Sequence, residues 1–241
     1  MDIVLYEEPI KIEIKDENIY ANGAKVHRTV RIVRDMKDTL KDKEVATQYS
    51  NKHLYYMYRD VYKNNDIRFD ITHIPPNELG EELTKTHGHY HQKSPDGLDY
   101  PEVYQVIKGR AVFVLQKKLS SGMVDVIIID AKEGDPVLLP PGYGHVTVNK
   151  LDRDLILSNL VYDKFESRYD EYKENQGAAC YILKGGETQK NLNYMISNIE
   201  RVNATDLNAK YGFSSKNILE DFVKTPEKFE FLIKPRKLFK N

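Results

Sequence analysis

Short runs of β-branched and aromatic residues fill the middle of the chain, separated by clusters of Gly, Pro and Asp. This pattern is typical of β-strands joined by tight turns. Because the runs follow one another closely, they leave no room for crossover helices and favour an antiparallel barrel or sandwich over a parallel sheet. The pattern predicts strands at residues 53–61, 69–74, 103–108, 111–116, 124–130, 136–139, 145–148 and 155–162.

The two ends of the chain have a different pattern. The first part contains a short strand-like run at residues 11–15 and a polar stretch with helical character at 34–51. Near the other end, residues 203–210 and 215–224 have helical spacing with small or polar residues at the caps. We therefore predict three parts: an N-terminal arm packed on the barrel (residues 1–52), the barrel itself (53–190) and a C-terminal extension (191–241).

Composition narrows the possible partners. The chain of 241 residues has 36 Lys and Arg against 37 Asp and Glu, a net charge of -1. This balance does not suggest a nucleic-acid partner. No apolar run approaches membrane-spanning length, and no charged and then apolar leader opens the sequence. Cys180, the one cysteine, stands in an apolar stretch and is predicted to be a buried hydrophobe rather than a nucleophile. We expect a cytoplasmic protein that binds neither nucleic acid nor membrane.

One stretch, THGHYHQKSPDGLDYPEVYQVIKG, concentrates groups that can bind a metal. It places His87, His89 and His91 at alternate positions, which share one face if the segment is a strand. Glu102 and Tyr104 likewise share a face of the next strand. Imidazole and carboxylate groups gathered in this way are typical ligands of a divalent transition metal.

A second stretch adds one more histidine. The segment GDPVLLPPGYGHVTVN places His145 at the start of a strand, just after a Pro/Gly turn. Two imidazoles from one strand, a carboxylate from the next and an imidazole from a later strand would suit a metal with open coordination positions.

Together these stretches resemble the two motifs of the cupin family. The matching residues are GHYH at 88–91, Glu102 with Gly109, the Pro-Pro-Gly turn before His145, and Asn149. More narrowly, the sequence is similar to the cupin-type phosphoglucose isomerases of archaea and some bacteria. The similarity extends to VRDMK at residues 33–37 and DITHIPP at 70–76, and it spans roughly residues 20 to 170.

The resemblance implies a fold and an activity. The fold is an all-β cupin barrel, also called a double-stranded β-helix or jelly roll, with an N-terminal arm and a small C-terminal helical extension. The activity is interconversion of glucose 6-phosphate and fructose 6-phosphate by a homodimer that pairs through its N-terminal strands. One divalent ion per chain (iron, manganese, nickel or zinc) is implied, held by His89, His91, Glu102 and His145.

The resemblance also assigns roles around the metal. Glu102 would be both a metal ligand and the base that moves a proton between neighbouring carbons, and Tyr104 would line the pocket beside it. A metal-assisted hydride shift is the competing mechanism. The phosphate of the sugar phosphate would be bound by Thr72, Thr86, Gly88 and Tyr162.

The sequence departs from the family in two places. Ten residues separate His91 from Glu102, which predicts an extra turn at the barrel mouth. After Tyr162, a histidine that family members carry is absent, and Arg168 or Tyr169 would have to take its place. The family tolerates various residues at the position of His87, so His87 is not assigned to the metal or the substrate. The three histidines outside the motifs, His27, His53 and His73, are expected to be ordinary surface or core residues.

Two other kinds of function stay open. Three histidines and a glutamate also serve iron-dependent oxygenases, and the barrel could belong to an oxygenase or a sugar epimerase. Alternatively, the protein could be a sensor that binds a sugar phosphate without turnover.

Overall fold

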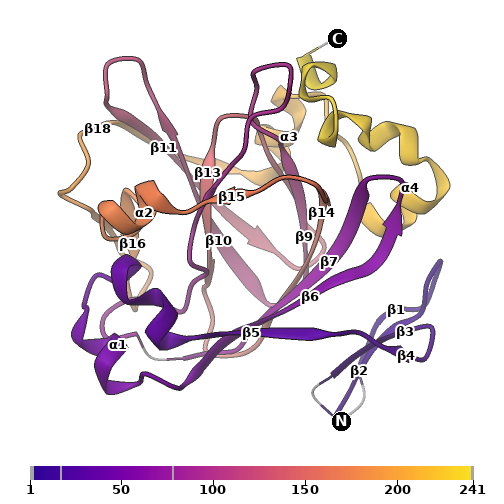
Figure 1. Ribbon diagram of the computed structural model, residues 1–241, viewed down its shortest axis with the longest axis horizontal. Coiled ribbons are helices and arrows are strands. Elements are labelled where there is room, and N and C mark those ends of the chain that lie inside the picture. The colour runs from indigo at the N-terminus through magenta and orange to yellow at the C-terminus, as the bar shows by residue number, and fades with distance from the viewer. Residues whose placement is uncertain (1–2, 17, 78, 240–241) are drawn as a thin grey trace.

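Two sheets face each other across an apolar core and form the barrel (Figure 1). The computed structural model describes residues 3–16, 18–77 and 79–239. The six-stranded sheet runs in the order β12 (Pro136–Leu139), β9 (Glu102–Lys108), β14 (Leu155–Tyr162), β7 (Ile67–Ile74), β6 (His53–Asn64) and β5 (Arg28–Ile32). The four-stranded sheet runs in the order β13 (Gly144–Asn149), β10 (Arg110–Lys118), β11 (Val124–Lys132) and β18 (Ile196–Asn203).

Alternation along the strands divides apolar residues between the inside and the outside of the barrel. On β14, Leu155 and Leu157 join the inner core with Phe113 of β10, whereas Ile156 and Leu160 belong to a second core on the outer face. Successive side chains of a strand point to opposite faces, so both faces of the six-stranded sheet must be covered.

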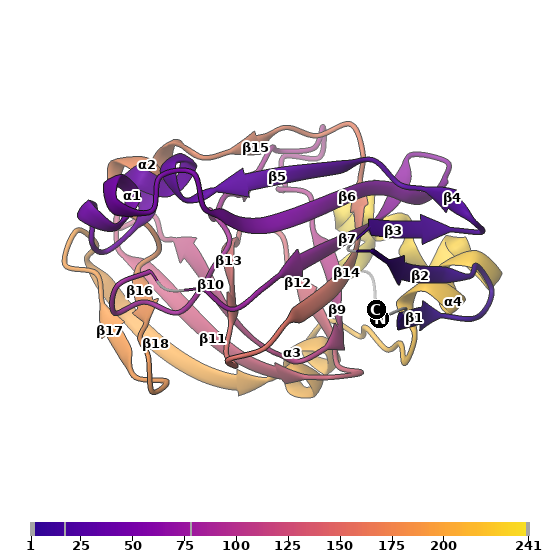
Figure 2. The same ribbon diagram turned by 90° about the horizontal axis from the view of Figure 1, so that it is seen from below.

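Both ends of the chain cover the outer face of the six-stranded sheet. A small antiparallel sheet of β1 (Ile3–Tyr6), β2 (Ile12–Lys15), β3 (Asn18–Ala21) and β4 (Ala24–Lys25) lies at the same end as the C-terminal helices α4 (Ile218–Lys224), η2 (Pro226–Leu232) and η3 (Pro235–Phe239) (Figure 2). Ile12 and Ile19 from the first group and Phe222 and Phe229 from the second are buried against Phe69. Each such side chain stabilises the fold by about 1.5–3 kcal/mol.

The outer face of the four-stranded sheet has its own cover. Val112 and Val146 of that sheet pack against Tyr172 and Cys180. These come from α2 (Asp170–Glu174) and from β16 (Cys180–Ile182), which pairs with β17 (Thr188–Lys190). Burial raises the pKa of the Cys180 thiol to about 11, so Cys180 is a buried hydrophobe, as predicted.

The all-β barrel is confirmed, and each predicted strand overlaps an observed one. The polar stretch at 34–51 contains two short helices, η1 (Val33–Thr39) and α1 (Glu44–Gln48), and residues 203–210 contain α3 (Ala204–Lys210). Within the described part of the chain, no helix is long and apolar enough to span a membrane.

Within the two barrel sheets, β5 and β18 were not predicted. β5 pairs with β6, and β18 pairs in parallel with β11, so the predicted arm and the predicted extension each contribute a strand to the barrel. The parallel pairing departs from the antiparallel pattern expected from the sequence. The division at residues 52 and 190 itself stays a prediction.

Candidate metal centre

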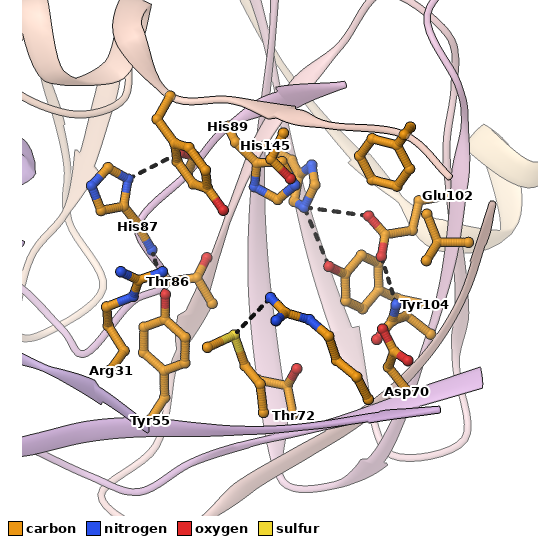
Figure 3. A pocket seen from close by; sticks show the side chains of 18 of the residues that line it. Arg31, Tyr55, Asp70, Thr72, Thr86, His87, His89, Glu102, Tyr104 and His145 are labelled. Carbon is orange, nitrogen blue, oxygen red and sulfur yellow. Dashed lines mark hydrogen bonds and ion pairs between the residues drawn. The ribbon is translucent and has the colours of Figure 1, made fainter. Parts of the chain in front are cut away.

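Polar side chains gather at one end of the barrel interior (Figure 3). Glu102 and Tyr104 face inward from β9, and Asn159 faces inward from β14. They line a cavity of about 90 Å³ that reaches the surface between the strands and the segment after Tyr162. The opposite half of the interior is filled with apolar side chains, so the chemistry is confined to this end.

Four side chains meet at one side of this cavity, and three of them, His89, Glu102 and His145, line it. One ligand atom from each of His89, His91, Glu102 and His145 lies within 4.8 Å of the others. The Nε2 atom of His91 is 3.2 Å from Nε2 of His89 and 3.3 Å from Oε2 of Glu102, and Nε2 of His145 is 3.7 Å from the same oxygen. Three imidazole nitrogens and a carboxylate oxygen at this spacing suit a divalent transition metal.

Backbone pairing carries the two motif segments to each other. The N–H of His145 donates to the carbonyl of His89 at 3.0 Å, and the reverse bond measures 3.2 Å. Only Tyr90–His91 (β8) is assigned as a strand, because Gly88 has a φ of 82° and interrupts the extended backbone. The alternate histidines are therefore not carried by one continuous strand, although His87 and His89 both line the cavity.

Neighbouring groups orient the ligand atoms. Nδ1 of His91 donates to the carbonyl of Tyr100 at 2.7 Å, which leaves Nε2 as the lone-pair atom. Nδ2 of Asn159 donates to Oε1 of Glu102 at 2.7 Å, so the other oxygen faces the imidazoles. Side chains that bind a metal typically make such an additional hydrogen bond to a neighbouring protein group.

Burial keeps these groups in the protonation states that bind a metal. It lowers the pKa of His89 well below its ordinary value and lowers the pKa of His145 to about 4, so both imidazoles are neutral at pH 7. Burial alone would raise the pKa of Glu102, but the adjacent imidazoles of His91 and His145 outweigh it and lower that pKa. Neutral imidazoles and a carboxylate are the forms that bind a metal.

A comparison with known proteins places the chain in a family. The family model described as glucose-6-phosphate isomerase matches residues 20–197. The chain belongs to the glucose-6-phosphate isomerase family. It is 31% identical over 191 residues to the glucose-6-phosphate isomerase of Pyrococcus furiosus, covering 77% of this chain and 95% of that one. The enzyme of the same name from Thermococcus onnurineus is 28% identical over 188 residues, covering 76% and 94%.

One solved structure with a partly similar backbone is more distant in sequence. The oxalate decarboxylase of Lactobacillus farciminis aligns with 47% of this chain and 30% of its own, at a TM-score of 0.35 and 20% sequence identity. This likeness says nothing about activity.

Among the residues predicted to bind substrate in this isomerase family member, three line the cavity. They are Thr72, Thr86 and Gly88. Oγ1 of Thr86 accepts the N–H of Thr147 at 3.0 Å, which leaves its hydroxyl proton free to donate. The structure gives the N–H of Gly88 no acceptor among the described residues.

Tyr162 is the predicted substrate-binding residue that does not line the cavity. On β14 the inward positions are Asn159 and Val161, so the strand directs Tyr162 outward. Its ring stacks on Tyr100 with 4.6 Å between ring centroids. The structure therefore does not bring Tyr162 to the cavity, and its contact with substrate stays a prediction.

Several cavity residues were missed by the sequence analysis. Arg31 of β5 and Tyr55 of β6 face the cavity beside His87 (Figure 3). The hydroxyl of Tyr55 accepts the N–H of His87 at 3.3 Å. Asn159 carried a usable signal, since an amide inside the apolar run LILSNLVY must find a buried partner.

The two residues suggested in place of the missing family histidine behave differently. Tyr169 lines the cavity, with its ring 5.0 Å from that of His87 and 5.5 Å from that of His89. Arg168 is outside the cavity lining, where it donates to the carbonyl of His91 and lies 3.4 Å from Asp99. Tyr169 is thus the one of the two that reaches the site.

Proposed function

We propose that this protein interconverts glucose 6-phosphate and fructose 6-phosphate with the help of one divalent ion per chain. The observation that carries the proposal is the convergence of His89, His91, Glu102 and His145 on one point of the cavity wall, in a chain of the glucose-6-phosphate isomerase family. Relatives that align along 94–95% of their own length bear the name of this isomerase. We further propose that the enzyme acts in the cytoplasm.

The donor set fits a resident metal. Three imidazoles and one carboxylate suit iron, manganese, nickel or zinc, and the hydrogen bond from Nδ1 of His91 supports ligation through Nε2. A divalent ion in this place would polarise the sugar carbonyl and neutralise the charge that develops on its O1 and O2 oxygens.

Glu102 is positioned to move the proton that isomerisation requires. One proton must leave C2 of the aldose and arrive at C1 of the ketose. The carboxylate of Glu102 is ionised at pH 7, and Asn159 holds one of its oxygens in place. A base held in a fixed position near the substrate carbons would transfer the proton without first having to rotate into the reactive orientation.

Tyr104 supplies a hydrogen-bond donor beside the same carbons. Burial, with the negative charge of Glu102, raises its pKa well above the ordinary value, so the phenol stays protonated. Its hydroxyl is 3.3 Å from Nε2 of His145. From there it would donate to a substrate oxygen as charge builds on it.

The phosphate would sit at the part of the cavity lined by Thr72, Thr86 and Gly88. Two hydroxyls and a backbone N–H are neutral donors that a phosphate oxygen accepts well. They line the same cavity as the ligand residues His89, Glu102 and His145, so one molecule of sugar phosphate would reach both groups.

A coupled assay with metal-stripped protein tests the proposal. Fructose 6-phosphate conversion should disappear on stripping and return with one or more of Fe²⁺, Mn²⁺, Ni²⁺ and Zn²⁺. His145→Ala should stay inactive with every ion, whereas His73→Ala should behave as wild type because His73 is outside the cavity lining. Oxygen consumption with Fe²⁺, or tight binding of fructose 6-phosphate without turnover, would instead indicate an oxygenase or a sensor.

A further inference from the structure

Three arginines, Arg31, Arg59 and Arg68, line the cavity, and they differ in how closely a carboxylate approaches each guanidinium. Nε of Arg68 donates to Oδ2 of Asp70 at 2.8 Å, so this pair is neutral overall. Arg31 is 4.0 Å from Asp35. Arg59 forms no ion pair with any carboxylate in the part of the chain that the structure describes. Its side chain instead donates from Nη2 to Sδ of Met57 at 3.8 Å, which is a weak interaction.

The alternation of β6 directs Arg59 toward the cavity. Tyr55, Met57 and Arg59 occupy successive inward positions of this strand, and all three line the cavity. Met57 pairs across the sheet with Thr72 of β7. Because Nη2 of Arg59 folds back onto Met57, the guanidinium lies next to the Met57–Thr72 pair.

A bulge in β6 lies between Tyr58 and Tyr62 and includes Arg59, and Asp70 binds the backbone of Asp60 within it. The pairing of β6 with β7 shifts register between Tyr58 and Tyr62, and Asp60 there has a φ of 55°. The N–H of Asp60 donates to Oδ1 of Asp70 at 3.0 Å, and Arg68 holds the other oxygen of the same carboxylate. Bulges beside active sites commonly re-aim a side chain, and this one fixes the backbone that carries Arg59.

We propose that Arg59 binds the phosphate of the sugar phosphate and makes the site selective for phosphorylated substrates. This inference rests on the proposed isomerase function. An arginine without a carboxylate partner keeps its fork of N–H donors for a phosphate, which it can hold by two parallel hydrogen bonds. Its position next to Thr72 places this cation beside the neutral donors already assigned to the phosphate. Since Arg59 is exposed, it lies at the cavity mouth, where it meets an entering dianion.

Replacement of Arg59 tests the inference in the metal-loaded protein. In Arg59→Gln, the KM for fructose 6-phosphate should rise about tenfold or more, the cost of losing a hydrogen bond between charged groups, while kcat changes little. Arg59→Lys should recover part of the loss, because lysine keeps the charge without the fork. Arg153→Gln is the matched control, because Arg153 is an exposed arginine outside the cavity lining.

Calorimetric titration with inorganic phosphate provides a readout that does not depend on turnover. Wild type should bind phosphate, Arg59→Gln should bind it about tenfold more weakly, and unphosphorylated fructose should show no difference between them. An unchanged phosphate affinity in Arg59→Gln, or no phosphate binding by wild type at millimolar concentration, would overturn the inference. If wild type binds phosphate through Arg59 but isomerises neither sugar phosphate, the proposed function fails and the role of Arg59 stands.

Discussion

Glu102 is the residue at which metal binding and proton transfer can be separated. Glu102→Gln keeps the size of the side chain but removes the base, so turnover should fall by roughly 10²–10⁴-fold. Nδ2 of Asn159 donates to Oε1 of Glu102, so the amide must turn its NH₂ group toward the imidazoles or lose the Asn159 bond. Metal affinity should therefore weaken without disappearing. Steady-state rates and metal content of the same preparation give both quantities.

Deuterium at C2 of glucose 6-phosphate supplies the control for this substitution. Proton transfer through an enediol exposes the label to water, so part of it should be lost from the product. A hydride shift would carry all of it to C1. Complete retention, together with near-normal turnover in a metal-loaded Glu102→Gln, would leave Glu102 as a ligand alone.

Among individual residues, the sequence identified best those whose spacing along the chain is itself the signal of a metal site. His89, His91, Glu102 and His145 were predicted from their motifs, and the structure brings them together. Tyr162 is directed away from the cavity because the register of β14 sets its direction, which a motif does not specify. Arg59 was missed because an arginine in a strand resembles any surface arginine until a bulge and its pairing partner are known.

Gly88 shows how a single backbone position controls the motif segment. Its φ of 82° disfavours any side chain, and an added Cβ would lie 2.5 Å from Cγ2 of Val146 and 2.7 Å from the ring of Tyr172. Gly88→Ala should therefore lower the free energy of unfolding by about 2–5 kcal/mol, from backbone strain and overpacking together. It should also lower metal affinity, because His89 is the next residue.

Gly97→Ala is the matched control for this element. Gly97 has a similar φ of 79°, but an added Cβ would meet nothing within 4 Å. Its cost should be the backbone strain alone, about 1–2 kcal/mol, with metal affinity unchanged. Equal losses in urea unfolding of the two variants would show that packing against Val146 and Tyr172 is unimportant.

Strands with a continuous apolar run were predicted well from the sequence. Strands that are held mainly by hydrogen bonds to a neighbouring strand were predicted poorly. The strand at Leu155–Tyr162 was predicted to the residue, since its apolar run is buried on both faces. β18 was missed because its sequence, ISNIERVN, is polar and half-exposed, and hydrogen bonds to β11 hold it in place. The turn predicted between His91 and Glu102 is present, with the N–H of Ser94 donating to the carbonyl of Leu98 at 2.8 Å.

For the whole molecule, the structure points to one strand, β1, as the interface of the predicted homodimer. β1 is an edge strand of the small N-terminal sheet, and Val4 on it is 44% exposed. An edge strand with an exposed apolar side chain is suited to pairing with a second copy of the chain. Truncation would not test this, because Ile12 and Ile19 of the same sheet are buried in the chain's own core.

A charged residue introduced on the exposed face of β1 tests dimer formation without disturbing the fold of the monomer. The wild-type protein at micromolar concentration should show about twice the chain mass of 28.0 kDa by light scattering. Val4→Asp should shift the mass toward that of one chain, with little change in melting temperature, because a charge on an exposed face costs little in the monomer but is expensive to bury unpaired. Leu192→Asp, at a residue 94% exposed and distant in sequence from β1, should remain dimeric. A dimeric Val4→Asp would move the interface away from this face of β1, and a monomeric wild type would refute the dimer itself.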